Sequence, residues 1–140
     1  MKTITAIGVV CLCALFACED TQIIDNLTGS WELQTYLRND VEETSDILIT
    51  DYKEIYNMDG TISRSYIDGN QNEVSETGEY SIDEENRTIH ISDLSSISEF
   101  SEANSTLSSS TLNVLVIDET EYAYSFENGG DKHEFRFFRE

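Results

Sequence analysis

The sequence of 140 residues contains no proline, and its three cysteines all lie within the first 18 positions. Without proline, no strand is interrupted by a residue that lacks the backbone N–H donor. The absence of cysteine from residues 19–140 excludes disulfides, zinc–thiolate sites and thiol catalysis from that part of the chain. Its length of about 120 residues suits one domain with one hydrophobic core.

Positive charge is also scarce. The chain has 8 Lys and Arg residues against 28 Asp and Glu residues, which gives a formal net charge of −20. A body this acidic repels nucleic acid and anionic membrane surfaces, so we expect no nucleic-acid partner. The charge is interpreted as a source of solubility, and an acidic binding face is the alternative.

Patterns typical of catalysis and metal binding are missing. The two histidines lie far apart in the sequence. His90 lies between two isoleucines, so its side chain should face solvent. His133, near the last turn, alternates in step with residues expected to face inward. Neither has a second histidine or a cysteine nearby, so both are interpreted as solvated side chains. No Gly-x-Ser-x-Gly nucleophile elbow is present. We therefore expect no enzymatic activity, no metal site and no cofactor.

The N-terminus has the features of a secretory signal. Lys2 is the only charge before Glu19, and residues 4–17 form an apolar run that is shorter than the roughly 20 residues a membrane span needs. Leu15-Phe16-Ala17-Cys18 then resembles a bacterial lipobox, in which the cysteine is acylated and becomes the first residue of the mature protein. That resemblance implies a signal peptide over 1–17, acyl chains such as palmitate on Cys18 and a lipidated tether over 18–26.

Acylation of Cys18 would determine where in the cell the protein is located. Two or more acyl chains give stable membrane attachment, so the resemblance implies an outer-membrane lipid anchor in a bacterial cell envelope. The acidic Glu19 and Asp20 resemble surface-export signals, but the run is short, and the alternatives of a periplasm-facing and a cell-surface domain both stay open. The oligomeric state is not predicted.

After residue 27 the chain consists of short runs rich in aromatic and β-branched residues, separated by Asp, Asn and Gly. This pattern is typical of an all-β sandwich or barrel. The predicted strands are 31–37, 47–57, 61–67, 74–82, 88–91, 112–117, 122–126 and 133–138.

Turn chemistry and apolar matching predict the register of three hairpins. The turn NMDGT places Tyr56 opposite Ile62, Glu54 opposite Arg64 and Tyr52 opposite Tyr66. A four-residue turn over 84–87 places Ile82 opposite Ile89 and Tyr80 opposite Ile91. A four-residue turn before the last strand places Phe126 by His133, Tyr124 by Phe135 and Tyr122 by Phe137.

The segment 93–111 departs from the strand pattern, because 8 of its 19 residues are serine. Its apolar residues recur at spacings of three and four, which is compatible with a short helix or a lid that covers one end of the barrel, but the serine content favours a loop. A flexible serine-rich loop is therefore the favoured alternative.

Several motifs together resemble the small lipocalin-like β-barrel lipoproteins of Bacteroidota. They are LTGSWEL, with Leu27, Gly29, Trp31 and Leu33, followed in order by NMDGT, GEYSI and the C-terminal FRFFR. The resemblance covers residues 27–140 and implies one antiparallel up-and-down barrel of about eight strands. It also implies that Trp31 closes the barrel base and that Arg139, which shares the parity of Phe135 and Phe137, packs on it as a structural contact.

The NMDGT register places Glu54 and Arg64 on the more apolar face, which should point inward. An ion pair there could orient the polar group of a ligand in an aromatic cavity. The favoured alternative is an outward or rim pair, which would contribute little to stability. The candidate lining consists of residues predicted to face inward: Tyr52, Glu54, Tyr56, Ile62, Arg64, Tyr66, Tyr80, Tyr124 and Phe126.

Two functions follow from this reading. In the first, the barrel binds one small apolar or amphipathic molecule in its interior, which requires a cavity of about 300–1,000 Å³. In the second, the barrel is filled and the acidic loops or the serine-rich segment contact a protein or glycan on the cell surface. The seven tyrosines are compatible with both.

Overall fold

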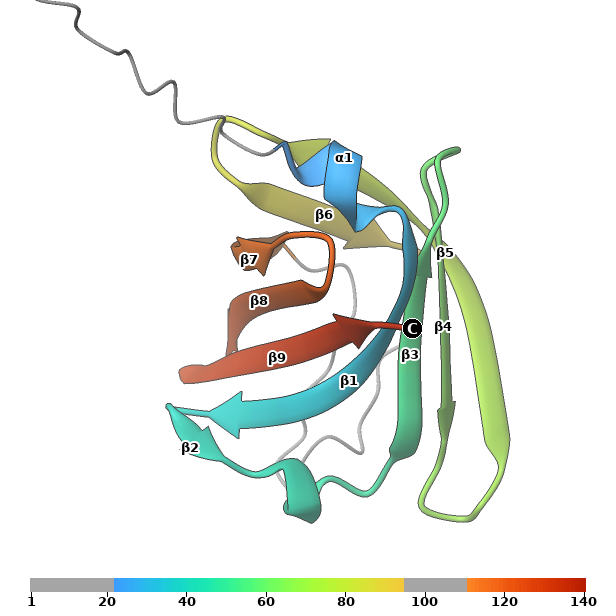
Figure 1. The fold of residues 1–140 in the computed structure, drawn as a ribbon. Coiled ribbons are helices and arrows are strands. Elements are labelled where there is room, and N and C mark those ends of the chain that lie inside the picture. Colours follow the sequence, from blue (N-terminus) through green and yellow to red (C-terminus); the bar gives the residue numbers. More distant parts are fainter. Residues whose placement is uncertain (1–21, 95–110) are drawn as a thin grey trace, which may run out of the picture.

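The computed structural model describes residues 22–94 and 111–140. One short helix precedes the sheet, and a 3-10 turn follows the second strand (Figure 1). The elements are α1 (Ile23–Leu27), β1 (Gly29–Arg38), β2 (Val41–Glu42), η1 (Thr44–Asp46), β3 (Thr50–Tyr56), β4 (Thr61–Ile67), β5 (Glu73–Asp83), β6 (Thr88–Ser92), β7 (Thr111–Ile117), β8 (Glu121–Asn128) and β9 (Asp131–Arg139).

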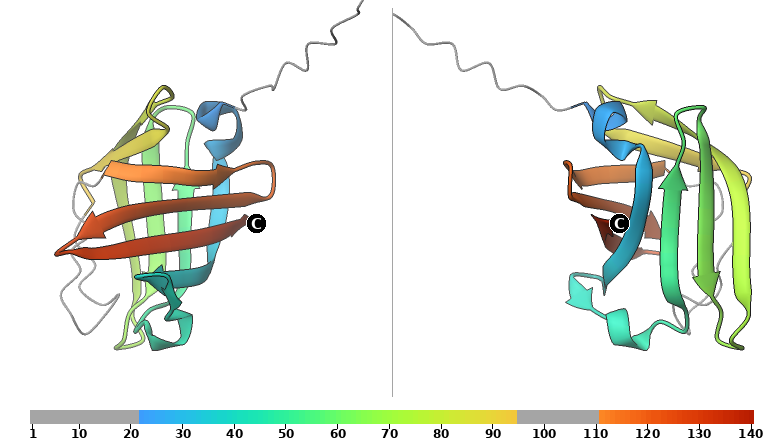
Figure 2. Two further views of the ribbon diagram at one scale, coloured as in Figure 1. Left: turned by 90° about the vertical axis from the view of Figure 1, so that its left-hand side faces the viewer. Right: turned by 45° about the vertical axis from the view of Figure 1, so that its right-hand side comes forward.

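The strands form one antiparallel sheet in the order β2-β1-β3-β4-β5-β6-β7-β8-β9, and β1 also pairs with β9. That last pairing closes β1 and β3–β9 into a barrel, with β2 as an additional strand on the end of β1. Figure 2 shows the two walls of the barrel crossing at a steep angle. The predicted antiparallel up-and-down barrel is confirmed.

The hairpin registers are confirmed with one exception. Tyr56 pairs with Ile62, Glu54 with Arg64, and the pairings predicted for the second and third hairpins are all present. The exception lies at the start of β3, where the register shifts between Thr50 and Lys53, so Tyr52 is not a simple cross-strand partner of Tyr66. Asp51 adopts a positive φ of 53° at this bulge. The extra residue forms a bulge that bends β3. The alternation of apolar and polar residues in the sequence does not predict such a bulge.

The segment 18–26 is not entirely a tether. Its last residues belong to α1, where Ile23 and Leu27 lie one helical turn apart and are completely buried. Both oxygens of Glu84, from the β5–β6 turn, accept backbone N–H groups at the start of this helix, from Ile23 and Ile24 at 2.9 Å. A distant carboxylate thus caps a helix too short to be stable alone.

Helix α1 covers one end of the barrel (Figures 1 and 2). The indole Nε1 of Trp31 donates to the Leu27 carbonyl at 2.7 Å, and the Arg139 guanidinium lies 4.4 Å from the Trp31 ring centroid. Arg139 also donates to the carbonyls of Asn26 and Thr28. The contact expected between Trp31 and Arg139 is present, and it ties the last strand to the first helix.

Gly29 makes room for this contact. Its φ is 137°, and a Cβ at this position would lie 2.7 Å from Nη1 of Arg139. Glycine alone tolerates both the backbone conformation and the close approach.

Cys18, the signal peptide over 1–17 and most of the serine-rich segment 93–111 lie outside the described residues. Within residues 22–94 and 111–140, no helix is long and apolar enough to cross a membrane.

Candidate functional site in the barrel interior

All nine candidate lining residues lie on the inner face of the barrel. None has more than 9% of its surface exposed, and the charged Glu54 and Arg64 are 2% and 3% exposed. Their common burial follows from the strand geometry of β3 and β4, in which every second side chain points to the same face of the sheet. The outward alternative for Glu54 and Arg64 is wrong. Whether these residues bind a ligand stays a prediction.

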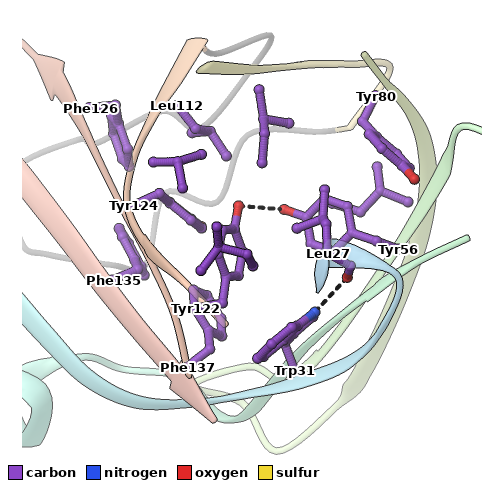
Figure 3. Packing of buried hydrophobic residues seen from close by; sticks show 14 of the residues in the cluster. Leu27, Trp31, Tyr56, Tyr80, Leu112, Tyr122, Tyr124, Phe126, Phe135 and Phe137 are labelled. Atoms are coloured by element: carbon purple, nitrogen blue, oxygen red, sulfur yellow. Dashed lines mark hydrogen bonds between the residues drawn. The ribbon is translucent and has the colours of Figure 1, made fainter. Parts of the chain in front are cut away.

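Glu54 is the centre of a buried cluster of hydroxyl groups. Its Oε1 accepts hydrogen bonds from the hydroxyls of Tyr52 at 2.7 Å and Tyr124 at 2.9 Å, and its Oε2 accepts one from Tyr56 at 2.8 Å. Tyr52 and Tyr56 flank Glu54 on the inner face of β3, whereas Tyr124 reaches it from β8. Tyr122 extends the cluster, with its hydroxyl 3.3 Å from that of Tyr56 (Figure 3).

The burial of this cluster shifts its protonation equilibria. Loss of hydration raises the pKa of Glu54 above its usual value of 4.5, and the tyrosine donors and the charge of Arg64 only partly oppose this. Burial, reinforced by the Glu54 charge, also raises the pKa values of Tyr52, Tyr56 and Tyr124 well above 10. The phenols therefore stay protonated and remain donors at neutral pH.

The expected ion pair between Glu54 and Arg64 needs a correction. The two residues are cross-strand partners, but Nη2 of Arg64 donates to Oε2 of Glu76 on β5. Glu76 is the partner of Arg64 across the β4–β5 ladder, so the guanidinium turns toward that side and acts on Glu54 through its charge. No sequence pattern singled out Glu76, because carboxylates are abundant in this chain.

Aromatic side chains surround the polar cluster. Tyr124 stacks on Phe135 and Phe137, with ring centroids 5.3 and 5.5 Å apart, and Tyr122 stacks on Phe137 at 5.6 Å. Figure 3 shows these rings together between the strands, with Leu27 and Trp31 near one end. The site is therefore a carboxylate with phenol donors, embedded in an aromatic wall.

A second polar contact inside the barrel was not predicted. His133 is 2% exposed, its Nδ1 lies 2.8 Å from the Tyr36 hydroxyl, and its ring stacks on Phe126 at 5.0 Å. The interpretation of His133 as a solvated side chain is wrong, although its inward parity was the signal that could have revealed burial. Burial lowers the pKa of His133 below 6.5 and raises that of Tyr36 to about 12.

The barrel resembles solved structures from Bacteroides. It matches a lipocalin-like protein from Bacteroides uniformis ATCC 8492 with a TM-score of 0.56 and 20% identity, covering 79% of this chain and 96% of that one. The fold is lipocalin-like. An uncharacterized protein from Bacteroides eggerthii DSM 20697 matches with a TM-score of 0.53 and 16% identity, covering 81% and 98% of the two chains. No family model and no curated protein matches the sequence.

In this lipocalin-like barrel, the chemistry available to the Glu54 cluster is recognition of a polar group. A phenol can donate one hydrogen bond and accept others, while an ionised carboxylate only accepts. A ligand donor could take the place of one tyrosine on Glu54, and the displaced hydroxyl could then bond the ligand. The aromatic wall supplies apolar contact for the remainder of such a molecule.

Proposed function

We propose that this protein is a lipid-anchored lipoprotein of the bacterial outer membrane, acylated at Cys18, whose lipocalin-like barrel binds a small amphipathic molecule. The observation that carries the ligand-binding proposal is the Glu54 cluster inside an aromatic wall. The lipobox-like residues 15–18 support the anchor, and the domain faces the periplasm or the cell surface.

Burying the Glu54 cluster in the core requires an unfavourable desolvation free energy. Removing a carboxylate from water costs several kcal/mol, and a whole buried polar group with its partners is often replaceable by apolar side chains without loss of stability. Three phenols directed at one carboxylate nevertheless provide a set of adjustable donors and acceptors at the centre of the barrel. Polar groups placed sparingly in an apolar lining are typical of small-molecule sites.

A filled barrel that acts as a surface interaction module is the second candidate. The observation in its favour is that the interior rings already contact one another and that Glu54 already has three donors. In this reading the polar cluster specifies the packing, and the acidic outer surface or the serine-rich segment meets a protein or glycan.

Native mass spectrometry of the full-length protein, extracted in detergent from the cells that make it, separates the two candidates. Ligand binding predicts an adduct that survives removal of the detergent and is lost in Glu54→Leu but kept in Glu134→Gln, a change on the outer face. A wild-type mass without such an adduct, together with tight packing around Glu54, would contradict the proposal that the barrel binds a ligand.

The anchor is tested independently. Mass spectrometry of the N-terminal peptide should show thioether- and amide-linked acyl chains on Cys18 in the wild type, and Cys18→Ser should abolish them and release the protein from the membrane fraction. An unprocessed N-terminus on the wild-type protein would contradict the proposal.

A further inference from the structure

The wall of the barrel is open between β1 and β3. Their ladder runs from Gly29 paired with Tyr56 to Glu32 paired with Lys53 and ends there. Beyond this point both strands carry irregularities, one between Leu33 and Thr35 in β1 and one between Thr50 and Lys53 in β3. Bulges bend a strand and end its pairing, so the two strands separate along the rest of their length.

A cleft occupies this opening, with a volume of about 290 Å³. Its apolar lining comes from Leu33, Ile47 and Ile49, and the buried Tyr52 also lines it. Glu32 and Asp51 also line it, and Asp51 is exposed to solvent. The lining therefore combines two carboxylates and three aliphatic side chains with the polar side chains of Gln34, Thr44 and Thr50.

The charge of the cleft is of one sign. Its lining contains two carboxylates and no basic side chain. Lys53 interacts through its charge with Glu32 and Asp51, but its Nζ forms its ion pair with Glu140. Among the ion pairs of the described residues, none includes Glu32 or Asp51. Both carboxylates are thus available to a cation from solution.

We propose that this cleft binds a small amphipathic cation of the alkylammonium class. The ammonium group lies between the carboxylates of Glu32 and Asp51, and the aliphatic chain contacts Leu33, Ile47 and Ile49. Charge complementarity selects a cation over an anion, and the three aliphatic side chains favour an alkylated cation over a hydrated inorganic one. The site lies in the barrel wall and requires neither the lipid anchor nor a ligand at Glu54.

Butylammonium and butyrate form a matched pair of probes, because they share an aliphatic chain and differ in charge. The full-length protein, labelled at isoleucine and leucine methyl groups and held in lipid nanodiscs, is titrated with each and followed by NMR. Butylammonium should shift the methyl signals of Leu33, Ile47 and Ile49 saturably, and butyrate should leave them in place. Interior methyls of Ile62 and Ile89 serve as internal references.

The double variant Glu32→Gln/Asp51→Asn should weaken butylammonium binding about tenfold or more, since two nearby charges are removed. Asn suits position 51 because it tolerates a positive φ. Glu85→Gln/Glu119→Gln removes the same charge from two exposed turns and should leave binding unchanged.

Three outcomes overturn the proposal: equal shifts from butyrate, undiminished binding by the Glu32/Asp51 variant, or shifts centred on the interior methyls. If the double variant does not fold, wild-type protein still decides the matter. Raising the ionic strength from about 0.05 to about 0.5 M should weaken butylammonium binding through screening, and binding that is insensitive to salt contradicts a role for the two carboxylates.

Discussion

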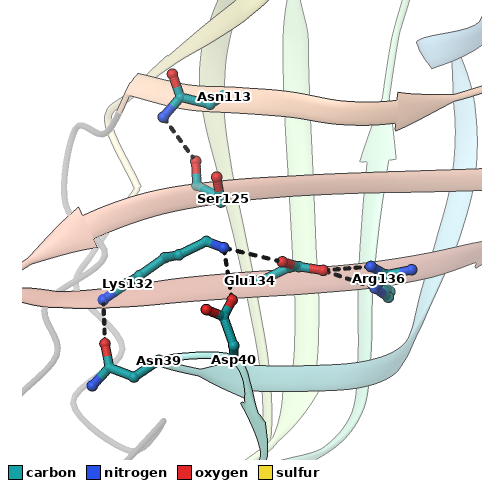
Figure 4. A network of polar contacts seen from close by, with 7 residues as sticks. All are labelled: Asn39, Asp40, Asn113, Ser125, Lys132, Glu134 and Arg136. Carbon is teal, nitrogen blue, oxygen red and sulfur yellow. Dashed lines mark hydrogen bonds and ion pairs between the residues drawn. The ribbon is translucent and has the colours of Figure 1, made fainter.

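Glu54 and Glu134 are both carboxylates with less than a tenth of their surface exposed, at 2% and 7%, yet their partners differ. Inside the barrel, Glu54 accepts from neutral phenols. On the outer side, Glu134 accepts from Arg136 at 2.7 Å and lies 3.7 Å from Lys132, in a network that continues to Asp40 (Figure 4). These two carboxylates therefore lie on opposite sides of the wall and have different kinds of donor.

The difference has an energetic meaning. Arg136 and Lys132 have side chains that are 44% and 42% exposed, so water screens their attraction to Glu134. Phenols carry no charge and are cheaper to bury than cations, which is why they can surround Glu54 on several sides. Glu54 is therefore stabilised mainly by hydrogen bonds from neutral phenols, and Glu134 by ion pairs.

The largest effect should come from removing the two carboxylates in turn. Glu54→Leu leaves three buried hydroxyls without their acceptor, at about 1–3 kcal/mol each, partly offset by relief of the buried charge. We expect the free energy of unfolding to fall by about 3 kcal/mol or more. Glu134→Leu should cost about 1 kcal/mol or less. Urea denaturation measures the free energy of unfolding of both variants. Equal losses would contradict the difference that we infer between the two carboxylates.

Removing one phenol hydroxyl should have a smaller effect. Tyr124→Phe deletes a hydrogen bond to a buried carboxylate and should cost about 1.5–3 kcal/mol. Tyr80→Phe deletes a bond of 2.7 Å to the Asn57 carbonyl, a neutral acceptor, and should cost about 0.5–1.5 kcal/mol. Thermal unfolding of both variants checks the order, and a larger loss in Tyr80→Phe would show that Glu54 is not held as an anion.

The pH dependence of stability should separate Glu54 from the outer carboxylates. Because burial raises its folded pKa above the usual 4.5, its contribution is fully present below about pH 4.5 and is lost as pH rises through the folded value. Each unit of elevation corresponds to about 1.4 kcal/mol. Wild type should therefore lose stability relative to Glu54→Gln as pH rises from 4 to about 8. A constant difference would mean that the folded and unfolded pKa values are equal.

The two C-terminal arginines give the smallest contrast. Arg139 faces the Trp31 ring, and Arg139→Met should cost about 0.5–2 kcal/mol through loss of the cation–π contact. Arg136→Met removes a partly exposed partner of Glu134 and should cost about 0.2–1 kcal/mol. Chemical denaturation in low and high salt distinguishes them, since only the second should depend on ionic strength. Salt dependence at Arg139 would contradict its assignment.

Much of the fold followed from patterns within single hairpins. The pairings of Tyr56 with Ile62, Ile82 with Ile89 and Tyr124 with Phe135 were predicted because a one-residue slip would expose apolar side chains. Parity also placed Glu54 and Arg64 inside. These predictions succeeded because they depend on neighbours a few residues apart.

The partners of those residues could not be predicted in the same way. Tyr124 lies 70 residues from Glu54 and meets it only because the barrel closes. Glu84 caps a helix 61 residues away, and the burial of Ile23 depends on that helix lying across the barrel end. Such contacts depend on how the sheet curves, which the alternation of side chains does not specify.

By itself, the sequence determined that this chain is an antiparallel β domain and which parity of the three hairpins faces inward. The resemblance of its motifs to lipocalin-like barrels added the expectation that Arg139 would meet Trp31. Only the tertiary structure decided that Glu54 is held by phenols, that Arg64 turns to Glu76 and that the wall opens between β1 and β3. The physical reason is that strand parity is a local property of the backbone. Hydrogen-bond partners across a barrel are fixed by closure and bulges, which depend on the whole sheet.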